Sequence, residues 1–272
     1  MTTASTIPIT TGQHDVPTAP PFPVLCDLDG VVWLSHNPIS GSADAIAQLR
    51  TAGHRVMFVT NNSASPIAEL EGALAAIGIA ATGDVLSSAN AAALLVEPRE
   101  RVMVCGGQGI VEALTARGAV VADEPPYDAV LVGFHRTFDY AEMQRSSAAV
   151  RAGARLIGTN DDATYPTPDG PIPGGGSILA GIATASGVSP IVAGKPYAPM
   201  ASLVRVVTGL DDLRHAVMVG DRPDTDGRFA ATLGCRYAHV WSGVTVAGTV
   251  VEPSPWLEGQ NLAAIVAQLL AV

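Results

Sequence analysis

The sequence predicts an α/β protein built on a mostly parallel sheet with helices on both faces. Short apolar runs alternate with helix-like segments along most of the chain, as they do where helical crossovers join parallel strands. These runs are apolar throughout instead of alternating with polar residues. That pattern is typical of strands that are buried on both faces of a parallel sheet.

The expected elements are assigned in chain order from apolar periodicity and from the turn residues that bound each run. The expected strands are Pro23–Leu28, His54–Thr60, Val102–Cys105, Ala129–Val132, Arg155–Gly158, Ala216–Gly220 and Tyr237–Val240. The expected helices are Ser42–Thr51, Ala64–Ile77, Asn90–Leu95, Ala141–Arg151, Ala198–Val207, Arg228–Leu233 and Leu262–Leu269. The three tryptophans, Trp33, Trp241 and Trp256, are interpreted as packing residues.

Two segments are rich in turn residues, Asn160–Ser177 and Val251–Gly259. The first is too long for an ordinary connection, which indicates a functional or partly structured loop. A glycine cluster at Gly106–Gly109 lacks the full GxGxxG pattern of a dinucleotide loop, so a structural turn is favoured. The cluster Gly174–Ser177 fits either an anion site or a plain turn into a helix.

Composition and charge narrow the class of protein. The chain has 272 residues, 48% of them hydrophobic, so it can bury a large core. A net charge of −10 argues against a nucleic-acid partner, and no apolar run is long enough to span a membrane. The first 20 residues are rich in Thr and Pro, lack the features of a signal peptide and predict a flexible tail. A cytoplasmic location is expected.

The spacing of the cysteines and histidines also favours a cytoplasmic protein. Cys26, Cys105 and Cys235 are widely spaced, which suggests reduced thiols in the cytoplasm. The six histidines are scattered, so the spacing argues against a zinc site.

Four polar motifs stand at the ends of apolar runs, where ligands bind in open α/β sheets. They are DLDG from Asp27, TNNS from Thr60, GKP around Lys195 and GDRPDTD from Gly220. Asp27 and Asp29 are two residues apart at a strand end and would repel each other unless a cation lay between them. A hard ion such as Mg²⁺ fits, with Asp221 as a third oxygen ligand.

The same motifs supply the groups that phosphoryl transfer needs. A carboxylate can act as nucleophile through an aspartyl-phosphate. Thr60 and the backbone N–H of Asn61 can donate to phosphate oxygens. Lys195 is the only lysine beside 14 arginines, and its compact ammonium suits a tight phosphate site.

Each motif also has an interpretation without a catalytic role. The Asp27 and Asp29 pair could be turn residues, and Thr60–Asn62 could simply cap a helix. Asp221, Asp224 and Asp226 could be loop carboxylates near a helix start. The lysine could be a surface residue. These alternatives lose weight because all four motifs occur in one chain.

In this order, the motifs resemble those of the haloacid dehalogenase superfamily: DLDGV the first, VTNNS the second, GKP the third and GDRPDTD the fourth. Only 30 residues separate Asp29 from Thr60, while 134 lie between Thr60 and Lys195. The longer interval has room for an inserted α/β cap. That placement resembles the NagD-like or p-nitrophenylphosphatase branch, as do SGVT at Ser242–Thr245 and TNDDATYP.

The resemblance implies a Rossmann-like catalytic core at 21–87 and 191–272 and an inserted α/β cap domain at 88–190. It implies that Asp27 attacks phosphorus and ligates Mg²⁺, and that Asp29 is the acid/base and binds the metal through its carbonyl. Asp221 would be the third metal ligand, and Asp226 would support the metal or Lys195. Thr60, Asn61 and Lys195 would hold the phosphoryl group.

The function expected from these residues is Mg²⁺-dependent hydrolysis of a small-molecule phosphate monoester such as a sugar phosphate, glycerol phosphate or phosphoglycolate. A phosphoacceptor signalling domain and a non-catalytic phosphometabolite-binding protein are the alternatives; a dehalogenase would not need Asp29 or the metal carboxylates. Asn160–Ser177 is expected to contact the leaving group, with Arg136, Asp161 or Tyr165 as candidates. The resemblance also implies a possible homodimer through the cap.

Overall fold

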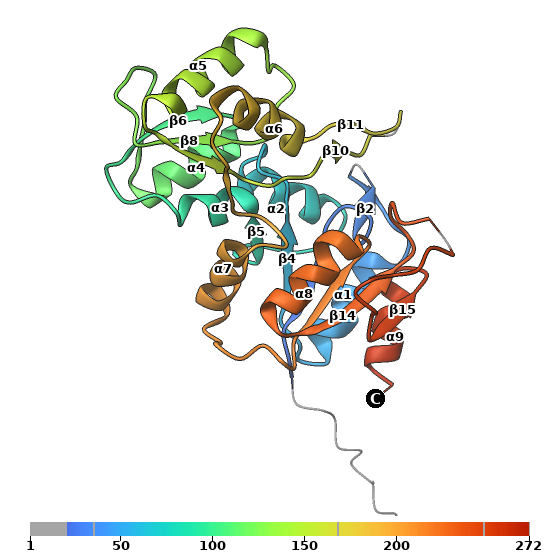
Figure 1. Ribbon diagram of the computed structural model, residues 1–272. Coiled ribbons are helices and arrows are strands. Elements are labelled where there is room, and N and C mark those ends of the chain that lie inside the picture. Colours follow the sequence, from blue (N-terminus) through green and yellow to red (C-terminus); the bar gives the residue numbers. More distant parts are fainter. Residues whose placement is uncertain (1–20, 35, 168, 247, 272) are drawn as a thin grey trace, which may run out of the picture.

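A six-stranded parallel sheet forms one half of the molecule (Figure 1). The computed structural model describes residues 21–34, 36–167, 169–246 and 248–271, so the expected N-terminal tail lies outside the described residues. Across this first sheet the strands are β15 (Leu257–Gly259), β14 (Arg236–Val240), β13 (Val217–Gly220), β1 (Val24–Cys26), β4 (Val56–Thr60) and β5 (Val85–Ser87). All neighbouring strands are parallel, which confirms the predicted fold class.

Helices cover both faces of the first sheet. One face packs on α1 (Ser42–Thr51), α2 (Ile67–Ala76) and α9 (Leu262–Leu269). The other face packs on α3 (Ser88–Ala93), α7 (Ala198–Thr208) and α8 (Arg228–Leu233). Buried apolar residues line both interfaces, so the strands are apolar on both sides, as the sequence pattern predicted.

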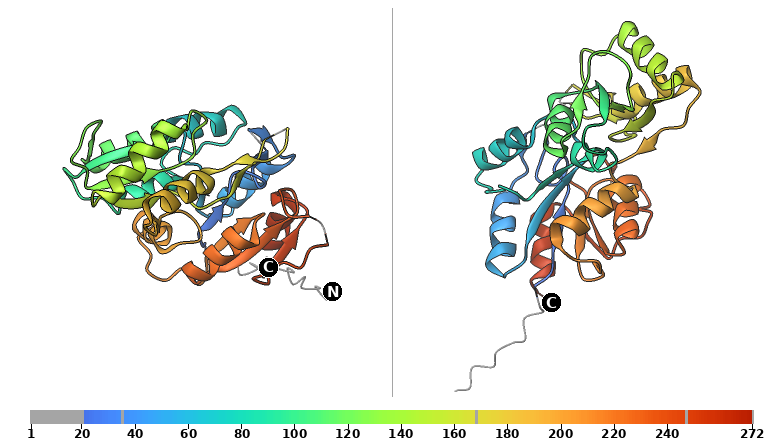
Figure 2. Two further views of the ribbon diagram at one scale, coloured as in Figure 1. Left: turned by 45° about the horizontal axis from the view of Figure 1, so that its top comes forward. Right: turned by 90° about the vertical axis from the view of Figure 1, so that its left-hand side faces the viewer.

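A second, five-stranded parallel sheet lies above the first in Figure 1. Its strands, in order, are β12 (Ile191–Val192), β9 (Arg155–Gly158), β8 (Ala129–Val132), β6 (Arg101–Cys105) and β7 (Val120–Val121). Its outer face packs on α5 (Tyr140–Arg151) and α6 (Gly175–Ser186). Figure 2 shows the two sheets as separate layers of one elongated molecule. Because β12 pairs with β9, residues 191–192 belong to this second sheet.

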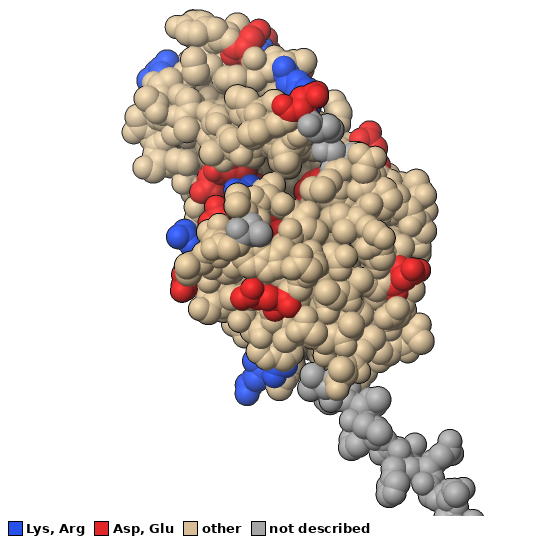
Figure 3. Space-filling model, turned by 90° about the vertical axis from the view of Figure 1, so that its right-hand side faces the viewer, with Lys and Arg blue, Asp and Glu red and all other residues tan. Residues whose placement is uncertain are grey.

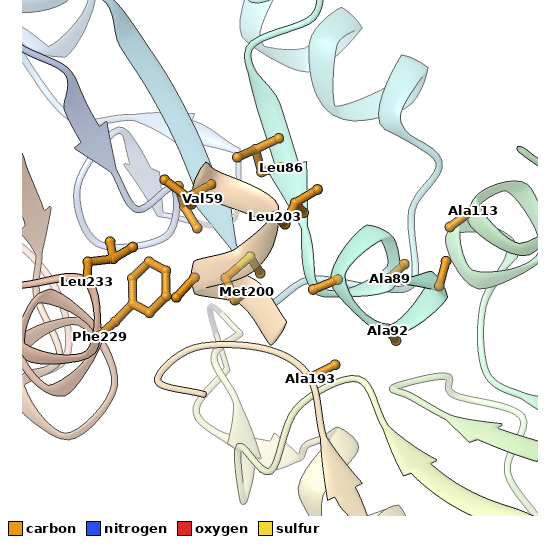
Figure 4. Packing of buried hydrophobic residues seen from close by; sticks show 14 of the residues in the cluster. Val59, Leu86, Ala89, Ala92, Ala113, Ala193, Met200, Leu203, Phe229 and Leu233 are labelled. Atoms are coloured by element: carbon orange, nitrogen blue, oxygen red, sulfur yellow. The ribbon is translucent and has the colours of Figure 1, made fainter. Parts of the chain in front are cut away.

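One apolar cluster continues from the first sheet into the second. It runs from Val59 and Leu86 through Ala89 of α3 to Ala113 of α4 (Gln108–Arg117) (Figure 4). Small alanines at this junction let α3 and α4 approach closely. The two sheets are therefore joined by a continuous core.

The remaining strands are short and antiparallel. β2 (Trp33–Leu34) pairs with β3 (Asn37–Pro38), and β10 (Thr164–Tyr165) pairs with β11 (Ile172–Pro173). The latter hairpin gives structure to the long turn-rich segment. No helix in the described part of the chain is both long and apolar enough to cross a membrane.

The start of one helix and the environment of one tryptophan differ from the sequence expectation. The helix expected from Ala64 begins at Ile67, because the Asn62 side chain accepts a hydrogen bond from the Ala64 N–H at 2.9 Å and Pro66 caps the helix. Trp256 is 41% exposed and lies under the Arg236 guanidinium at 4.3 Å, so it is a surface cation–π residue and not part of the core.

The glycine clusters allow close packing between backbones. A Cβ on Gly107 would lie 2.5 Å from the Ala64 carbonyl oxygen, and one on Gly109 would lie 2.4 Å from that of Ser65. In the second cluster the N–H groups of Gly174 and Gly176 donate to the carbonyls of Ala163 and Asp162. Both clusters are thus turns into helices, and the N–H groups of Gly109, Gly174 and Gly176 donate to backbone carbonyls.

Candidate active site

The carboxylates converge at the point where the strand order of the first sheet reverses. From β1 the chain continues to β4 and β5 on one side, and later to β13, β14 and β15 on the other. Asp27 follows β1 and Asp221 follows β13, so the two emerge side by side at this switch point. Carboxylate oxygens of Asp27, Asp221 and Asp226 lie within 4.8 Å of one another.

Asp221 is held by backbone that approaches very closely. A Cβ on Gly30, whose φ is +86°, would lie 2.5 Å from the Asp221 Cγ, and one on Gly243 would lie 1.9 Å from its Oδ2. Oδ2 accepts a hydrogen bond from the Val244 N–H at 2.7 Å. The buried Oδ1 has no hydrogen-bond partner among the described residues. An unpaired buried carboxylate oxygen is what a cation site requires.

Burial raises the pKa of Asp221 well above its ordinary value, and the charges of Asp226 and Asp27 act in the same direction. Burial also raises the pKa of Asp226 to about 6, although Lys195 opposes this. Both shifts have the same physical origin, which is negative charge concentrated away from water. A divalent cation among these carboxylates would remove that cost.

Lys195 is buried between two of these carboxylates. Its Nζ lies 2.8 Å from Asp27 Oδ1 and 2.7 Å from Asp226 Oδ1. Burial lowers the pKa of Lys195, but Asp226 and Asp27 outweigh it and raise the pKa, so the ammonium stays charged. The ionised carboxylates of Asp27, Asp221 and Asp226 carry three negative charges, and the Lys195 ammonium carries one positive charge. The remaining two negative charges match a divalent ion such as Mg²⁺. The residues therefore fit the predicted cofactor.

Asp226 fixes the position of the lysine. Its Oδ2 accepts a hydrogen bond from the Arg222 N–H at 3.2 Å, while Oδ1 accepts from Lys195. It lies in a single π-helical turn, η1 (Pro223–Gly227), of a kind often found at functional sites. A Cβ on Gly220 would lie 2.2 Å from the Asp226 Cγ, so glycine is required there.

Thr60 and Asn61 follow β4 at the same edge of the sheet. Thr60 Oγ1 accepts a hydrogen bond from the Asn62 N–H at 3.1 Å, which leaves the hydroxyl proton free to be donated. The Asn61 side chain bridges to the backbone of Lys195, accepting from its N–H at 2.8 Å and donating to its carbonyl at 3.1 Å. The amide of Asn61 thus joins the second motif to the third.

A cleft of about 930 Å³ opens over these groups and separates the two sheets. Asp27, Asp29, Thr60, Asn61, Lys195, Asp221 and Asp226 line it, so the structure brings together all seven residues expected from the sequence. Figure 3 shows charged side chains gathered at the junction between the two parts of the molecule.

The second sheet contributes an aromatic wall to this cleft. Tyr165 stacks on Phe134, with ring centroids 4.7 Å apart and planes 6° apart. Burial raises the pKa of Tyr165 and Asp29 adds to that effect, while Arg136 opposes it. Tyr165 therefore lies near the expected acid/base, on the opposite side of the cleft.

The other two residues expected to contact the leaving group do not line the cleft. Arg136 and Asp161 are not among the described residues that line the cleft. The Asp161 carboxylate accepts a hydrogen bond from the Tyr197 hydroxyl at 2.5 Å. Its neighbour Asp162 lines the cleft instead, 3.0 Å from Asn61 Nδ2 and 3.6 Å from Arg222.

Asp162 and Arg222 are residues of the cleft that sequence reasoning missed. Arg222 lies inside the fourth motif, but an arginine there gives no signal of its own, because Lys195 already supplies the cation that a phosphate site needs. Two adjacent aspartates in the turn-rich segment were equivalent by pattern. Only the fold shows that the second of them faces the cleft.

Comparison with known proteins agrees with this geometry. Residues 24–120 match a family described as haloacid dehalogenase-like hydrolase, and residues 192–268 match a second profile of the same superfamily. The chain is 33% identical over 234 residues to an acid sugar phosphatase of Staphylococcus saprophyticus, covering 85% of this chain and 90% of that protein. It is 37% identical over 239 residues to a D-glycerol 3-phosphate phosphatase of Mycobacterium tuberculosis, covering 85% of this chain and 66% of that protein.

Solved structures show the same architecture. A p-nitrophenyl phosphatase from Archaeoglobus fulgidus superposes with a TM-score of 0.85 at 27% identity, over 90% of this chain and 98% of the other. A glycerol phosphate phosphatase from Mycobacterium tuberculosis in complex with magnesium superposes with a TM-score of 0.81 at 32% identity, over 92% and 78% of the two chains. The chain belongs to the haloacid dehalogenase-like hydrolases, in the NagD-like branch that includes the p-nitrophenyl phosphatases.

Proposed function

We propose that this protein is a Mg²⁺-dependent phosphatase that hydrolyses a small-molecule phosphate monoester through an aspartyl-phosphate on Asp27. The observation that carries the proposal is the position of Asp27 at the switch point of the sheet. It is paired with Lys195 at 2.8 Å and lies in one cluster with Asp221. The phosphatase names of the relatives support the same reaction type.

Mg²⁺ would be held by Asp27, Asp221 and the backbone carbonyl of Asp29. When bound, the ion supplies a positive charge that offsets the charge of the phosphoryl group. Asp226 acts from outside the metal ligands, because it holds Lys195.

In the first step, a carboxylate oxygen of Asp27 forms a bond to phosphorus while the bond from phosphorus to the ester oxygen breaks. Asp29 gives its proton to the departing oxygen. In the second step, Asp29 takes a proton from a water molecule that attacks phosphorus, and the bond to Asp27 breaks. The products are an alcohol and inorganic phosphate, and both aspartates return to their starting states.

Three donors would hold the phosphoryl oxygens during both steps. They are the Thr60 hydroxyl, the Asn61 backbone N–H and the Lys195 ammonium. Because the Asn61 side chain is occupied by Lys195 and Asp162, its contribution comes through the backbone. Preorganised donors of this kind stabilise charge without rearranging during the reaction.

The segment 88–190 would act as the cap that selects the leaving group. Tyr165 and Phe134 form an uncharged aromatic part of the cleft wall, and the charge of Asp29 contributes to the raised pKa of Tyr165. A cleft of about 930 Å³ suits a sugar phosphate, glycerol phosphate or phosphoglycolate.

The proposal is tested by p-nitrophenyl phosphate hydrolysis with and without Mg²⁺. Asp27→Asn is expected to lower kcat by roughly 10⁴-fold or more. Asp44→Asn, on the exposed face of α1, is the matched control and is expected to keep full activity. Full activity of Asp27→Asn, or hydrolysis unaffected by a chelator, would contradict the mechanism.

Two further assays on the same protein distinguish the alternative functions. A phosphoacceptor domain would retain label on Asp27 after treatment with a phosphodonor. An idle binding protein would bind a phosphate ester in saturating Mg²⁺ without releasing phosphate.

Two further expectations stay predictions. A homodimer through the cap would use surface such as the edge strand β7, where Val120 and Val121 are partly exposed. Sedimentation at several concentrations would measure its presence. A cytoplasmic location would be measured by fractionation of cells that produce the protein.

A further inference from the structure

A second cluster of metal-ligating side chains lies at the carboxyl edge of the second sheet. Cys105 is the last residue of β6, His135 follows β8, and Glu142 lies in the first turn of α5. The Cys105 Sγ, a His135 ring nitrogen and a Glu142 carboxylate oxygen lie within 4.8 Å of one another. The scattered spacing of cysteine and histidine argued against a zinc site, but the fold brings these residues together.

The distances in this cluster are those expected between ligands of one shared cation. His135 Nε2 is 3.7 Å from Cys105 Sγ and 3.5 Å from Glu142 Oε2. A good N–H···O hydrogen bond spans about 2.9 Å. Tetrahedral zinc, with bonds of about 2.3 Å to sulfur and about 2.0–2.1 Å to nitrogen and oxygen, separates sulfur from nitrogen by about 3.6 Å and nitrogen from oxygen by about 3.4 Å.

Ser146 provides an independent observation. It lies one turn after Glu142 on α5 and is fully buried, and its hydroxyl has no hydrogen-bond partner among the described residues. It lies close enough to act on the Cys105 thiol, whose pKa is raised to about 12 by burial and by Glu142 and is lowered by Ser146. The Ser146 hydroxyl therefore lies beside the Cys105 thiol, where it offers a fourth ligand atom.

The orientation of the histidine fits metal binding. His135 Nδ1 lies 3.2 Å from Thr137 Oγ1, so the hydroxyl can accept the Nδ1 proton. Nε2 then keeps its lone pair directed at Cys105 and Glu142. Histidine ligands usually have such a partner on the other nitrogen.

We propose that Cys105, His135 and Glu142 bind a zinc-type transition-metal ion, with Ser146 or a water molecule as the fourth ligand. Binding converts the thiol to a thiolate and releases its proton to solvent. The thiolate and the carboxylate then balance the two charges of the ion, so the buried site is neutral.

This site would staple β6, β8 and α5 together. Phe134, which lines the cleft and stacks on Tyr165, is the residue before His135. Metal on His135 would therefore fix the loop that forms the aromatic wall. The site is separate from the carboxylate cluster and takes a different class of metal, because it has sulfur and nitrogen ligands.

The test is titration of the chelator-treated full-length protein with Co²⁺ in saturating Mg²⁺. We expect one equivalent of Co²⁺ to produce an intense sulfur-to-cobalt charge-transfer band in the near ultraviolet, which Zn²⁺ then abolishes. The all-oxygen carboxylate cluster cannot give this band. Its absence in the wild-type protein would overturn the proposal.

Variants assign the ligands. Cys105→Ser should lose the charge-transfer band, while Cys235→Ser, which removes a partly buried thiol, should keep it. Persistence of the band in Cys105→Ser would overturn the proposal. Thr137→Val is expected to weaken Co²⁺ binding by about 10-fold or more because it removes only the partner of Nδ1. Circular dichroism establishes whether each variant is folded. Glu142→Gln is a nearly isosteric change that should weaken Co²⁺ binding, so it tests the site even if Cys105→Ser does not fold. Unchanged Co²⁺ affinity in a folded Glu142→Gln variant would also overturn the proposal.

Discussion

The two parallel sheets of this protein turn their carboxyl ends toward the same cleft, but they contribute different chemistry. The first sheet ends in Asp27 and Asp221, which are charged and close together. The second sheet ends in Phe134 and Asn160, which are uncharged, and in the loop that carries Lys195. Under the proposed function, the first edge would supply the groups for bond cleavage, and the opposite edge would hold and select the substrate.

Lys195 is the exception that shows how the two sheets depend on each other. It follows β12, an edge strand of the second sheet, but its ammonium pairs with Asp27 and Asp226 of the first. The Asn61 side chain completes the link by hydrogen bonding the backbone of Lys195. A cation delivered from one sheet to the carboxylates of the other makes the site sensitive to how the two halves are aligned.

After Asp27→Asn, the largest effect should come from Asp29→Asn, which also changes the first sheet. Loss of the proposed acid/base is expected to lower turnover by about 10²- to 10⁴-fold. p-Nitrophenolate departs without a proton, so stopped-flow mixing with p-nitrophenyl phosphate should still show a burst, followed by slow turnover. Glycerol phosphate, whose alkoxide needs the proton, should give no burst. Absence of the burst with p-nitrophenyl phosphate would assign Asp29 another role.

Lys195→Met tests the link between the sheets. Removing the ammonium leaves buried carboxylates without their cation, which is expected to lower the free energy of unfolding by about 3–5 kcal/mol in the absence of Mg²⁺. Urea unfolding measures the change. Arg214→Gln removes an exposed ion pair with Asp212 and should leave the unfolding midpoint unchanged. Equal behaviour of the two variants would mean that Lys195 is not a structural cation.

Gly109→Ala tests the packing between the halves. Its Cβ would lie 2.4 Å from the Ser65 carbonyl oxygen, so the loop after Asn62 must shift, at a cost of about 1–3 kcal/mol in stability. Gly72→Ala is the matched control in α2, since nothing lies within 4 Å of its Cβ. It should stabilise the protein by up to about 1 kcal/mol. Thermal unfolding of both variants separates backbone crowding from helix propensity.

The sequence predicted the middle strands of both sheets better than their edge strands. Apolar runs gave β4, β8, β9 and β13 to within two residues, because buried parallel strands are long and uniform. Three missed strands, β5, β15 and β12, have only two or three residues, which is too short to show a repeating hydrophobic pattern. They are strands because they pair with a neighbouring strand in the fold. The carboxylates were predictable because their motifs follow such strands.

What the sequence could not give is the contact between distant loops. Asp162 faces the cleft and Asp161 turns to Tyr197, although the two are neighbours with the same side chain. The meeting of Cys105 with His135 depends on β6 lying beside β8. Such pairings are set by tertiary packing, which local pattern does not record.

The smallest effect should come from the aromatic wall of the second sheet. Tyr165→Ala removes one of the two stacked rings of the wall. An aromatic contact with the p-nitrophenyl ring would contribute about 0.5–1.5 kcal/mol, so kcat/KM for p-nitrophenyl phosphate should fall by roughly 2- to 13-fold. Glycerol phosphate, with no ring to contact the wall, should be affected less. Tyr140→Ala, at an exposed tyrosine of α5, is the control and should change neither value. If Tyr165→Ala lowered kcat/KM equally for both substrates, the wall would act by positioning the catalytic groups. The two sheets would then not have the separate roles of catalysis and substrate selection.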